Sequence, residues 1–187
     1  MGKVVLVEHL SLDGVMQAPA GVDEDVRGGF ARGGWAVPGN DQVMGDVLAK
    51  GRDGSGALLF GRRTYEQFHG YWPKQTDNPF TDVLNKSTKY VASRTLREPL
   101  PWANSVLIGD VGDVGQIEER LTVLGSGVLA QELMRRGLVG EWLLMVHPVV
   151  LGTGRRLFEG VETELRLVES VTTTTGVVIV RYEKEEA

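Results

Sequence analysis

The chain has 187 residues, of which 42% are hydrophobic, and it carries a formal net charge of −5 at pH 7. We expect one domain, residues 1–187, with a single substantial core. The acidic balance argues against a nucleic-acid partner, and the absence of cysteine excludes disulfides, thiolate catalysis and zinc–thiolate sites. Because no apolar run approaches membrane-spanning length and no signal peptide is evident, we expect a cytoplasmic protein without a membrane partner.

Short apolar runs alternate with helical patterns through the first two thirds of the chain. In chain order the patterns predict a strand at 4–10, a long loop at 16–39, a helix to about 50, a strand at 57–60, a helix from 61, a helix at 78–86, strands at 89–92 and 106–108, a helical turn at 116–120, a strand at 121–124 and a helix at 128–136. Strands separated by helices favour a largely parallel sheet. After an apolar stretch at 142–151, residues 165–182 alternate as a hairpin around Thr172–Gly176, which adds antiparallel edge strands.

Two of the expected helices carry clear end signals. Asn40 or Asp41 can cap the first helix, and Gly51 would stop it. Asn78 and Pro79 supply the cap and the first-turn proline of the helix at 78–86. These signals predict where the two helices begin, and none of these residues is a candidate for ligand binding.

A glycine turn joins the strand at 121–124 directly to the following helix. Gly125, Ser126 and Gly127 stand at this junction, and Gly61 stands at a similar junction earlier in the chain. Backbone N–H groups and the positive end of a helix dipole would point at whatever lies beyond the strand, which suits a phosphate group. A Gly-x-Gly at such a junction is also often only a tight turn, so both interpretations stay open at this point.

Several motifs at strand ends occur together and resemble the dihydrofolate reductase-like superfamily, more closely the branch of the C-terminal reductase domain of bacterial riboflavin biosynthesis. The resemblance spans nearly the whole chain, and its motifs are Ser11–Gly14, Gly61–Glu66, Lys89–Leu96, Gly125–Gly127 and Pro148–Phe158. It implies an α/β protein with a dihydrofolate reductase-like three-layer α/β/α fold, a mostly parallel mixed sheet and a C-terminal antiparallel hairpin. It also implies a homodimer that binds NADPH across the strand ends and transfers hydride to a flat heterocycle or related small-molecule acceptor.

The chemistry of the strand ends fits this cofactor. Backbone amides at the glycine turn could hold a pyrophosphate, and arginine guanidinium groups could bind further phosphate charge, including a 2′-phosphate. Each arginine taken singly is more often a solvated surface charge. The residues that we expect to contact NADPH are Gly61, Arg62, Arg63, Thr64, Ser93, Arg94, Gly125, Ser126, Gly127, Val128 and Leu129.

A second interpretation of the glycine turn is a dinucleotide-binding fingerprint, because Gly125–Ala130 satisfies its permissive G-x-G-x-x-A form. That motif belongs in the first βαβ unit with an acidic residue on the next strand, and this chain lacks both features.

The sequence departs from the riboflavin-reductase pattern at two places that could affect cofactor binding. Gly140 stands where the family usually has an acidic residue, and the segment Gly115–Leu121 is short.

The expected acceptor site centres on Asp13, which follows the first strand. A carboxyl group there could hydrogen-bond a heterocycle or relay a proton, although Asp-Gly is equally a favourable turn pair. Trp35, Tyr65 and Phe68 could supply apolar walls for a planar acceptor, although aromatic residues at such positions are more often part of the core.

Other chemistries have weaker support in the sequence. The three histidines are far apart and form no metal-binding pair, so we expect no metal. His9 and His147 lie in apolar strand patterns, where a structural role is at least as probable as catalysis. Gly152–Arg156 has the composition of an anion-binding nest or of a turn that plugs the core. The expected function is therefore an NADPH-dependent reductase, the alternative being a nucleotide-binding protein of the same fold without turnover.

Overall fold

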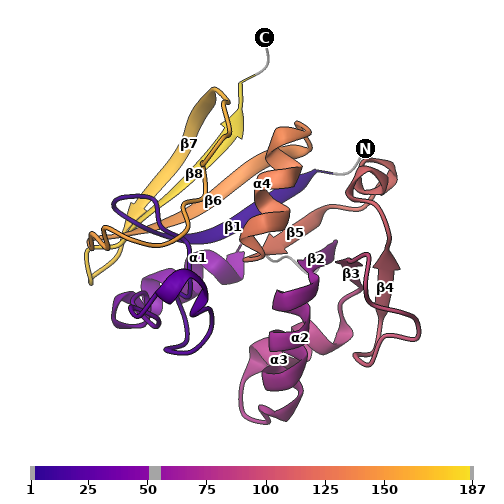
Figure 1. Ribbon diagram of the computed structural model, residues 1–187. Coiled ribbons are helices and arrows are strands. Elements are labelled where there is room, and N and C mark those ends of the chain that lie inside the picture. The colour runs from indigo at the N-terminus through magenta and orange to yellow at the C-terminus, as the bar shows by residue number, and fades with distance from the viewer. Residues whose placement is uncertain (1–2, 51–55, 186–187) are drawn as a thin grey trace. The chain divides into compact units, whose positions relative to one another are not determined.

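The computed structural model describes residues 3–50 and 56–185, which form two compact units (Figure 1). Of the described residues, unit 1 takes 3–5 and 56–139, and unit 2 takes 6–50 and 140–185. Strand β1 (Val4–Ser11) begins in unit 1 and continues in unit 2. The expectation of a single domain stays a prediction.

Unit 1 is built on parallel strands in the order β4-β3-β2-β5, followed by the start of β1. The central strand β2 is buried from Ala57 to Phe60, as expected for a parallel strand that is covered on both faces. Helices α2 and α4 both contact β2. The elements of the unit are β2 (Ala57–Gly61), α2 (Arg62–Tyr71), α3 (Pro79–Lys86), β3 (Lys89–Ala92), β4 (Ser105–Ile108), β5 (Leu121–Leu124), α4 (Gly127–Arg135) and the 3-10 turns η3 (Trp72–Lys74) and η4 (Val111–Gln116).

The helical turn expected at 116–120 was wrong in position. The structure has a 3-10 helix at Val111–Gln116, and residues 117–120 lead into β5 without helical structure. Asp110 explains the earlier start, because its side chain accepts a hydrogen bond from the Gly112 backbone N–H at 2.6 Å and caps the turn.

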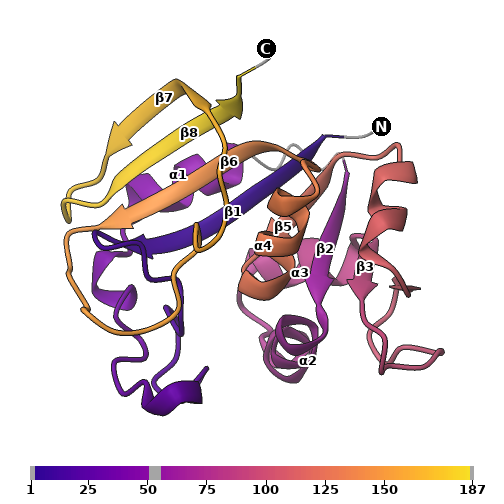
Figure 2. The same cartoon turned by 45° about the horizontal axis from the view of Figure 1, so that its top comes forward.

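Unit 2 is built on strands in the order β1-β6-β8-β7, and the β6–β8 and β8–β7 pairs are antiparallel (Figure 2). The C-terminal hairpin expected around Thr172–Gly176 is confirmed, because β7 and β8 flank that turn. Asp41 caps α1, as its side chain accepts from the Met44 N–H at 2.9 Å, while Gly51 lies outside the described residues. The elements are α1 (Gln42–Lys50), β6 (Val139–His147), β7 (Leu165–Thr172), β8 (Val178–Lys184) and the 3-10 turns η1 (Arg27–Gly29) and η2 (Val37–Gly39).

The strand pairing confirms an α/β fold with a mixed sheet, parallel in unit 1 and ending in antiparallel C-terminal strands. Gly140, one of the two departures from the family pattern, lies inside β6. None of the helices in residues 3–50 and 56–185 has the length and apolar content needed to cross a membrane.

A buried lysine fastens the end of α3 in unit 1. The Lys89 side chain is 0% exposed, and its ammonium donates to the carbonyl oxygens of Leu84 and Ser87, each at 2.7 Å. The same ammonium lies 4.7 Å from the centre of the Trp102 ring. Burial lowers the pKa of Lys89 to about 8. Lys89 therefore donates hydrogen bonds to carbonyl oxygens at the end of α3, as a C-terminal capping group would.

We expect Lys89→Met to lower the free energy of unfolding by about 2–3 kcal/mol, since it leaves buried carbonyl groups without a donor. Urea titration followed by circular dichroism would measure this change. The control is Lys86→Met, which breaks only an exposed ion pair with Asp82 and should change stability by less than about 0.5 kcal/mol. Equal stability of the Lys89 variant and the parent would contradict the capping role.

Candidate functional site

Three neighbouring parallel strands of unit 1 end at the same level. Gly61 of β2 pairs with Ala92 of β3. Leu59 of β2 pairs with Val123 of β5, so Gly125 follows its strand at the level of Gly61. The register therefore brings together the glycine junctions and the Ser93–Arg94 turn, which the sequence predicted to share one edge of the sheet.

A side-chain hydrogen bond joins the two glycine junctions. The Gly61 backbone N–H donates to the Ser126 hydroxyl oxygen at 2.8 Å. Ser126 has a φ of 68°, a left-handed conformation that is uncommon for a residue with a side chain. Thr64 lies close by, because a Cβ atom at Gly125 would be 3.8 Å from its methyl group. Ser126 thus holds the starts of α2 and α4 next to each other.

The helices at these junctions begin without a side-chain cap. Neither α2 nor α4 has a capping side-chain hydrogen bond at its N-terminus. Asp41 and Asn78 do cap the helices α1 and α3. The first backbone bond of α4 is from Ala130 N–H to the Ser126 carbonyl, so the N–H groups of residues 127–129 precede the helical ladder. Two adjacent uncapped helix starts make a favourable place for an anion.

The arginines expected at the cofactor differ in their contacts. Arg62 pairs with Glu66 one helical turn later, at 3.5 Å. In the described part of the chain, the guanidinium groups of Arg63 and Arg94 make no hydrogen bond or ion pair, and both residues are exposed. The Ser93 hydroxyl accepts backbone N–H groups of the turn that follows it, at 3.1 and 3.2 Å. Arg63 and Arg94 are therefore the cations with capacity for a ligand phosphate.

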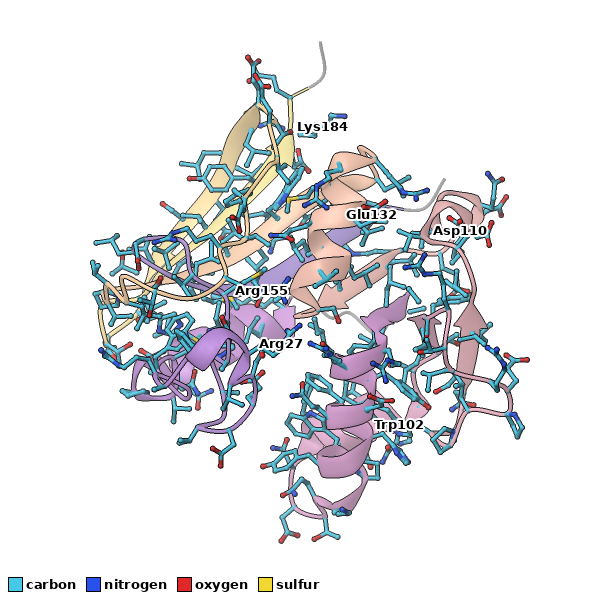
Figure 3. All side chains as sticks on the ribbon, viewed as in Figure 1. Arg27, Trp102, Asp110, Glu132, Arg155 and Lys184 are labelled. Carbon is cyan, nitrogen blue, oxygen red and sulfur yellow. The ribbon has the colours of Figure 1, made fainter. Side chains whose placement is uncertain are left out.

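Two of the aromatic residues expected at the acceptor, Tyr65 and Phe68, pack within unit 1. Tyr65 is 1% exposed, and its hydroxyl oxygen accepts the Trp102 backbone N–H at 3.0 Å. The Trp102 ring, labelled in Figure 3, has its centroid 6.1 Å from that of Tyr65. Phe68 lies between Phe60 and Trp72, with ring centroids 5.2 and 6.2 Å away. These contacts are those of core residues, so a part in acceptor binding stays a prediction for both.

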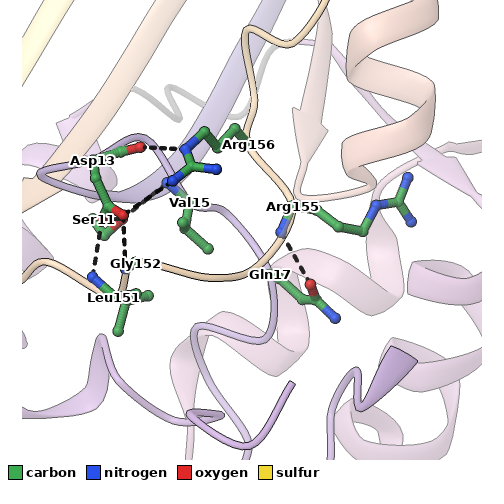
Figure 4. Close-up of polar contacts among 8 residues, drawn as sticks. All are labelled: Ser11, Asp13, Val15, Gln17, Leu151, Gly152, Arg155 and Arg156. Atoms are coloured by element: carbon green, nitrogen blue, oxygen red, sulfur yellow. Dashed lines mark hydrogen bonds and ion pairs between the residues drawn. The ribbon is translucent and has the colours of Figure 1, made fainter. Parts of the chain in front are cut away.

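Asp13 occupies an anion-binding nest formed by its own chain (Figure 4). One carboxylate oxygen accepts the Leu151 N–H at 3.0 Å and the Ser11 hydroxyl at 2.7 Å. The other accepts the Gly152 N–H at 2.9 Å and lies 3.4 Å from an Arg156 nitrogen. The Leu151 bond, followed by the Ser11 bond, holds the pKa of Asp13 well below its usual range. The Asp13 carboxylate and the Gly152 turn, which the sequence indicated separately, thus bind each other.

Gln17 completes this junction between two loops. Its side-chain oxygen accepts the Arg155 N–H at 3.0 Å, and its amide nitrogen donates to the Asp25 and Arg27 carbonyls. The Trp35 indole N–H donates to the Gln17 carbonyl at 2.7 Å. Trp35, which the sequence placed at the acceptor, is therefore held through Gln17, whose side chain binds Arg155, the neighbour of the Asp13 partner Arg156.

A histidine pair lies in unit 2, and sequence reasoning had given it no joint role. His9 Nδ1 and His147 Nε2 are 2.8 Å apart, although the residues are 138 positions apart in the chain. The Trp35 ring stands edge-on to His147, with centroids 5.4 Å apart. Burial, and then the neighbouring His147, lower the pKa of His9 to about 4, and burial also lowers the pKa of His147. Both rings are thus neutral near pH 7.

Glu8 is a buried acid that the sequence did not single out. Its side chain is 4% exposed, and its Oε2 atom has no hydrogen-bond partner among the described residues. Burial raises the pKa of Glu8 to about 8, with a further contribution from the charge of Glu24. The carboxyl group is therefore mostly protonated at neutral pH. In residues 3–50 and 56–185, no cluster of three or more acidic or histidine side chains could hold a metal ion.

Comparison with known proteins supports the family resemblance. Residues 115–179 match the family described as the RibD C-terminal domain. Over 191 residues the chain is 27% identical to the uncharacterized protein YyaP of Bacillus subtilis (strain 168), with coverage of 96% of this chain and 94% of that protein.

Solved structures share the fold at low sequence identity. A Shewanella sp. PV-4 protein provisionally assigned to riboflavin biosynthesis has a TM-score of 0.67 at 20% identity, over 98% of this chain and 99% of that one. A pyrimidine reductase-like protein of Corynebacterium diphtheriae has a TM-score of 0.66 at 13% identity, over 100% and 93%. Acinetobacter baumannii RibD has a TM-score of 0.67 at 14% identity, and the match covers all of this chain but 59% of RibD.

The dihydrofolate reductase-like fold and the resemblance to its RibD C-terminal branch, both predicted from the sequence, are confirmed by these matches. The individual site residues stay predictions.

Glu8 gives a pH-dependent prediction for stability. The folded state holds a proton on Glu8 between pH 4.5 and about 8, whereas the unfolded chain releases it, so the contribution of Glu8 to stability falls as pH rises through this window. We expect Glu8→Gln to remove a slope of up to about 1.4 kcal/mol per pH unit and to be more stable than the parent at pH 8.

Urea unfolding at a series of pH values would measure this difference between variant and parent. The exposed Glu118→Gln variant serves as the control and should keep the slope of the parent. Identical slopes for Glu8→Gln and the parent would mean that Glu8 is ionised in the folded protein.

Proposed function

We propose that this protein is an NADPH-dependent reductase that transfers hydride to a small heterocyclic acceptor, such as a pteridine or a ribosylaminouracil-like compound. The observation that carries the proposal is the pair of uncapped helix starts, α2 and α4, held together by the bond from Gly61 to Ser126. Bound NADPH would supply the hydride, and this chain would supply binding and orientation.

The phosphate groups of the cofactor fit the residues at this edge of unit 1. Backbone N–H groups of Gly127, Val128 and Leu129 would bind the pyrophosphate at the start of α4. Arg63 and Arg94 would bind the 2′-phosphate, because their guanidinium groups have donors available and lie at strand ends. The likeness to a pyrimidine reductase-like protein and to RibD supports the reductase assignment.

Asp13 acts at the acceptor end as a positioning residue in this proposal. A carboxylate that accepts four hydrogen bonds and has a lowered pKa is a poor proton donor near neutral pH. Its contacts instead fix the loop that contains Gly152 and Arg156. We therefore assign it the orientation of the acceptor site and not proton delivery.

We also propose that the protein is a homodimer. The apolar stretch at 142–151 is partly buried within the chain, since Trp142 is 2% exposed and Leu144 is 4% exposed. Exposed apolar side chains occur on the hairpin, where Leu167 is 51% and Val168 is 45% exposed. Both residues belong to β7, the last strand in the order of unit 2, and an edge strand can pair with a second copy.

Cofactor preference tests the proposal most directly. We expect NADPH to bind at least about 10-fold more tightly than NADH, a difference of about 1.4 kcal/mol, because of the charge-assisted bonds to the 2′-phosphate. Fluorescence titration would measure both affinities. Arg63→Gln and Arg94→Gln should reduce the preference, whereas the exposed Arg32→Gln should keep it. Equal affinities in the parent would overturn the 2′-phosphate assignment.

Gly127→Val tests the helix start itself. Gly127 has no positive φ, so valine causes no backbone strain there, but its side chain would stand where a phosphate approaches the N–H groups. We expect NADPH affinity to fall by about 10-fold or more, with an unchanged fold by circular dichroism. Gly70→Val makes the same substitution near the far end of α2 and is the control. Unchanged affinity in Gly127→Val would leave the junction as a structural turn.

Asp13→Asn separates turnover from cofactor binding. The amide cannot accept all four hydrogen bonds and places a donor against a backbone N–H group, so the loop at 151–152 should shift. Small displacements at a reactive site can reduce rates by about 100-fold, and we expect a loss of this size with NADPH affinity unchanged. Steady-state turnover and NADPH titration would measure the two effects. A protein that binds NADPH but reduces no acceptor would instead be the nucleotide-binding alternative.

A further inference from the structure

Two neighbouring arginines in unit 2 differ in what their guanidinium groups contact. Arg156 donates to the Asp13 carbonyl oxygen at 3.0 Å and lies 3.4 Å from the Asp13 carboxylate. The Arg155 guanidinium makes no hydrogen bond or ion pair with any described residue, although Arg155 is partly buried. Figure 4 shows the Arg155 side chain extending away from the contacts of Asp13. Arg155 therefore has hydrogen-bond donors that the described chain does not use.

Among the arginines that the structure describes, only Arg155 is both partly buried and without a side-chain partner. Arg32, Arg63 and Arg94 also lack a partner in that part of the chain, but all three are exposed to solvent. The remaining arginines interact with other groups. A partly buried guanidinium loses hydration, and no described protein group replaces it at Arg155. None of the Arg155 nitrogen atoms is wholly enclosed, so an anion from solution can reach them.

The backbone of Arg155 is held on both sides. Its N–H donates to the side-chain oxygen of Gln17 at 3.0 Å, and its carbonyl oxygen accepts the Met16 N–H at 2.9 Å. The preceding residue, Gly154, has a φ of 109°, and a Cβ atom there would lie 2.7 Å from the side chain of Val15. The segment is therefore packed closely against its neighbours, which fixes the point from which the Arg155 side chain starts.

The buried Gln17 also connects Arg155 to a second charged segment. Gln17 is 4% exposed, and its amide nitrogen donates to the carbonyl oxygens of Asp25 and Arg27 at 3.0 and 2.9 Å. The Arg27 guanidinium binds both carboxylate oxygens of Asp25. The hydrogen bond from the Arg27 side chain is the main cause of the lowered pKa of Asp25, and the charge of Arg155 adds to it. The positive charge of Arg155 therefore lies close to this ion pair.

The charges of this group do not cancel. Arg27 neutralises Asp25 through two charge-assisted hydrogen bonds, so Arg155 has no counterion of its own among the described residues. Glu24 is near in the chain, but its carboxylate accepts two backbone N–H groups of its own turn. The surplus positive charge and the available donors both favour an anion. A planar guanidinium binds two oxygen atoms of a carboxylate or phosphate side by side.

We propose that Arg155 is the centre of an oxyanion-binding site in unit 2, which takes the phosphate or carboxylate group of a small ligand. Gln17 is a positioning residue, since it holds both the Arg155 backbone and the segment 25–27. All of these residues belong to unit 2, so the site is additional to the phosphate contacts proposed for NADPH in unit 1. The inference goes beyond the proposed function and does not depend on hydride transfer.

Phosphate titration of the full chain labelled with ¹⁵N tests the site by nuclear magnetic resonance. Sodium phosphate is added at slightly acidic pH, and sodium chloride keeps the ionic strength constant. We expect the Nε–H and backbone N–H signals of Arg155 to shift and to saturate, with a weak, millimolar affinity. Sodium acetate, the second probe, distinguishes a carboxylate ligand from a phosphate ligand. Absence of a shift at Arg155 with both probes would overturn the proposal.

The same spectra separate this site from the proposed cofactor site. Backbone N–H signals of residues 127–129 report phosphate at the start of α4, whereas those of Arg155 report the site in unit 2. Shifts confined to residues 127–129 would overturn the proposal and leave the cofactor site standing. Failure of the parent to bind NADPH would overturn the reductase function and leave the Arg155 titration decisive for this site.

Variants of Arg155 test the guanidinium itself, with the backbone N–H signal of position 155 as the common readout. Arg155→Gln should weaken phosphate binding at this site by about 10-fold or more, because hydrogen bonds to a charged group are lost. Arg155→Lys keeps the charge but not the planar fork, and it should lose most of that affinity. Arg32→Gln removes an exposed, unpaired arginine of unit 2 and should keep the parent affinity. Parent affinity in Arg155→Gln would overturn the assignment.

Stability measurements distinguish ligand binding from a structural role of Arg155. In sodium chloride, Arg155→Gln should unfold at the urea concentration of the parent, because the lost guanidinium makes no hydrogen bond within the described chain. In phosphate at the same ionic strength the parent should become more stable by mass action, and the variant should gain less. A variant that is less stable in chloride and gains as much from phosphate as the parent would overturn the proposal. Weaker NADPH binding in Arg155→Gln would also overturn it, because Arg155 would then belong to the cofactor site.

Discussion

The hydrogen bond from the Gly61 N–H to the Ser126 hydroxyl is the contact on which the candidate cofactor site depends. It ties the start of one helix to the start of another, and the parallel register sets both at the same level. Ser126 has a left-handed conformation, and its hydroxyl oxygen accepts this bond, so its O–H can still donate to a ligand. The backbone N–H groups at the two helix starts are further donors for a ligand, and their direction is set by the helices themselves.

Local patterns were enough to predict much of unit 1. Gly61 and Gly125 break apolar runs into helical ones, and a parallel sheet brings such breaks to one edge. The Asn78 cap in unit 1, like the Asp41 cap in unit 2, was predictable because a capping side chain contacts a backbone group two or three residues away. The turn expected at 116–120 was misplaced because the Asp110 cap that starts it earlier had not been considered.

Unit 2 was harder to predict because its important contacts join distant parts of the chain. Nothing near His9 in sequence indicates His147, and the two meet only because β1 and β6 are neighbours in the sheet. The sequence predicted Asp13 as an acid at the acceptor and Gly152 as part of a nest or a core turn, but it did not indicate their mutual contact across 139 positions. Burial of Glu8 was equally unreadable, since a charged residue in a strand pattern usually faces solvent.

The intramolecular nest around Asp13 also bears on how this chain can change by mutation. The carboxylate, the Gly152 backbone and the Arg156 guanidinium form one unit made of two loops. A substitution on one loop leaves the other with unmatched charge or unmatched N–H groups, so the two loops accept changes best in combination. In a set of diverging relatives, positions 13 and 156, whose side chains meet, should therefore vary together or not at all, and loops transplanted from another member should be transplanted as a pair.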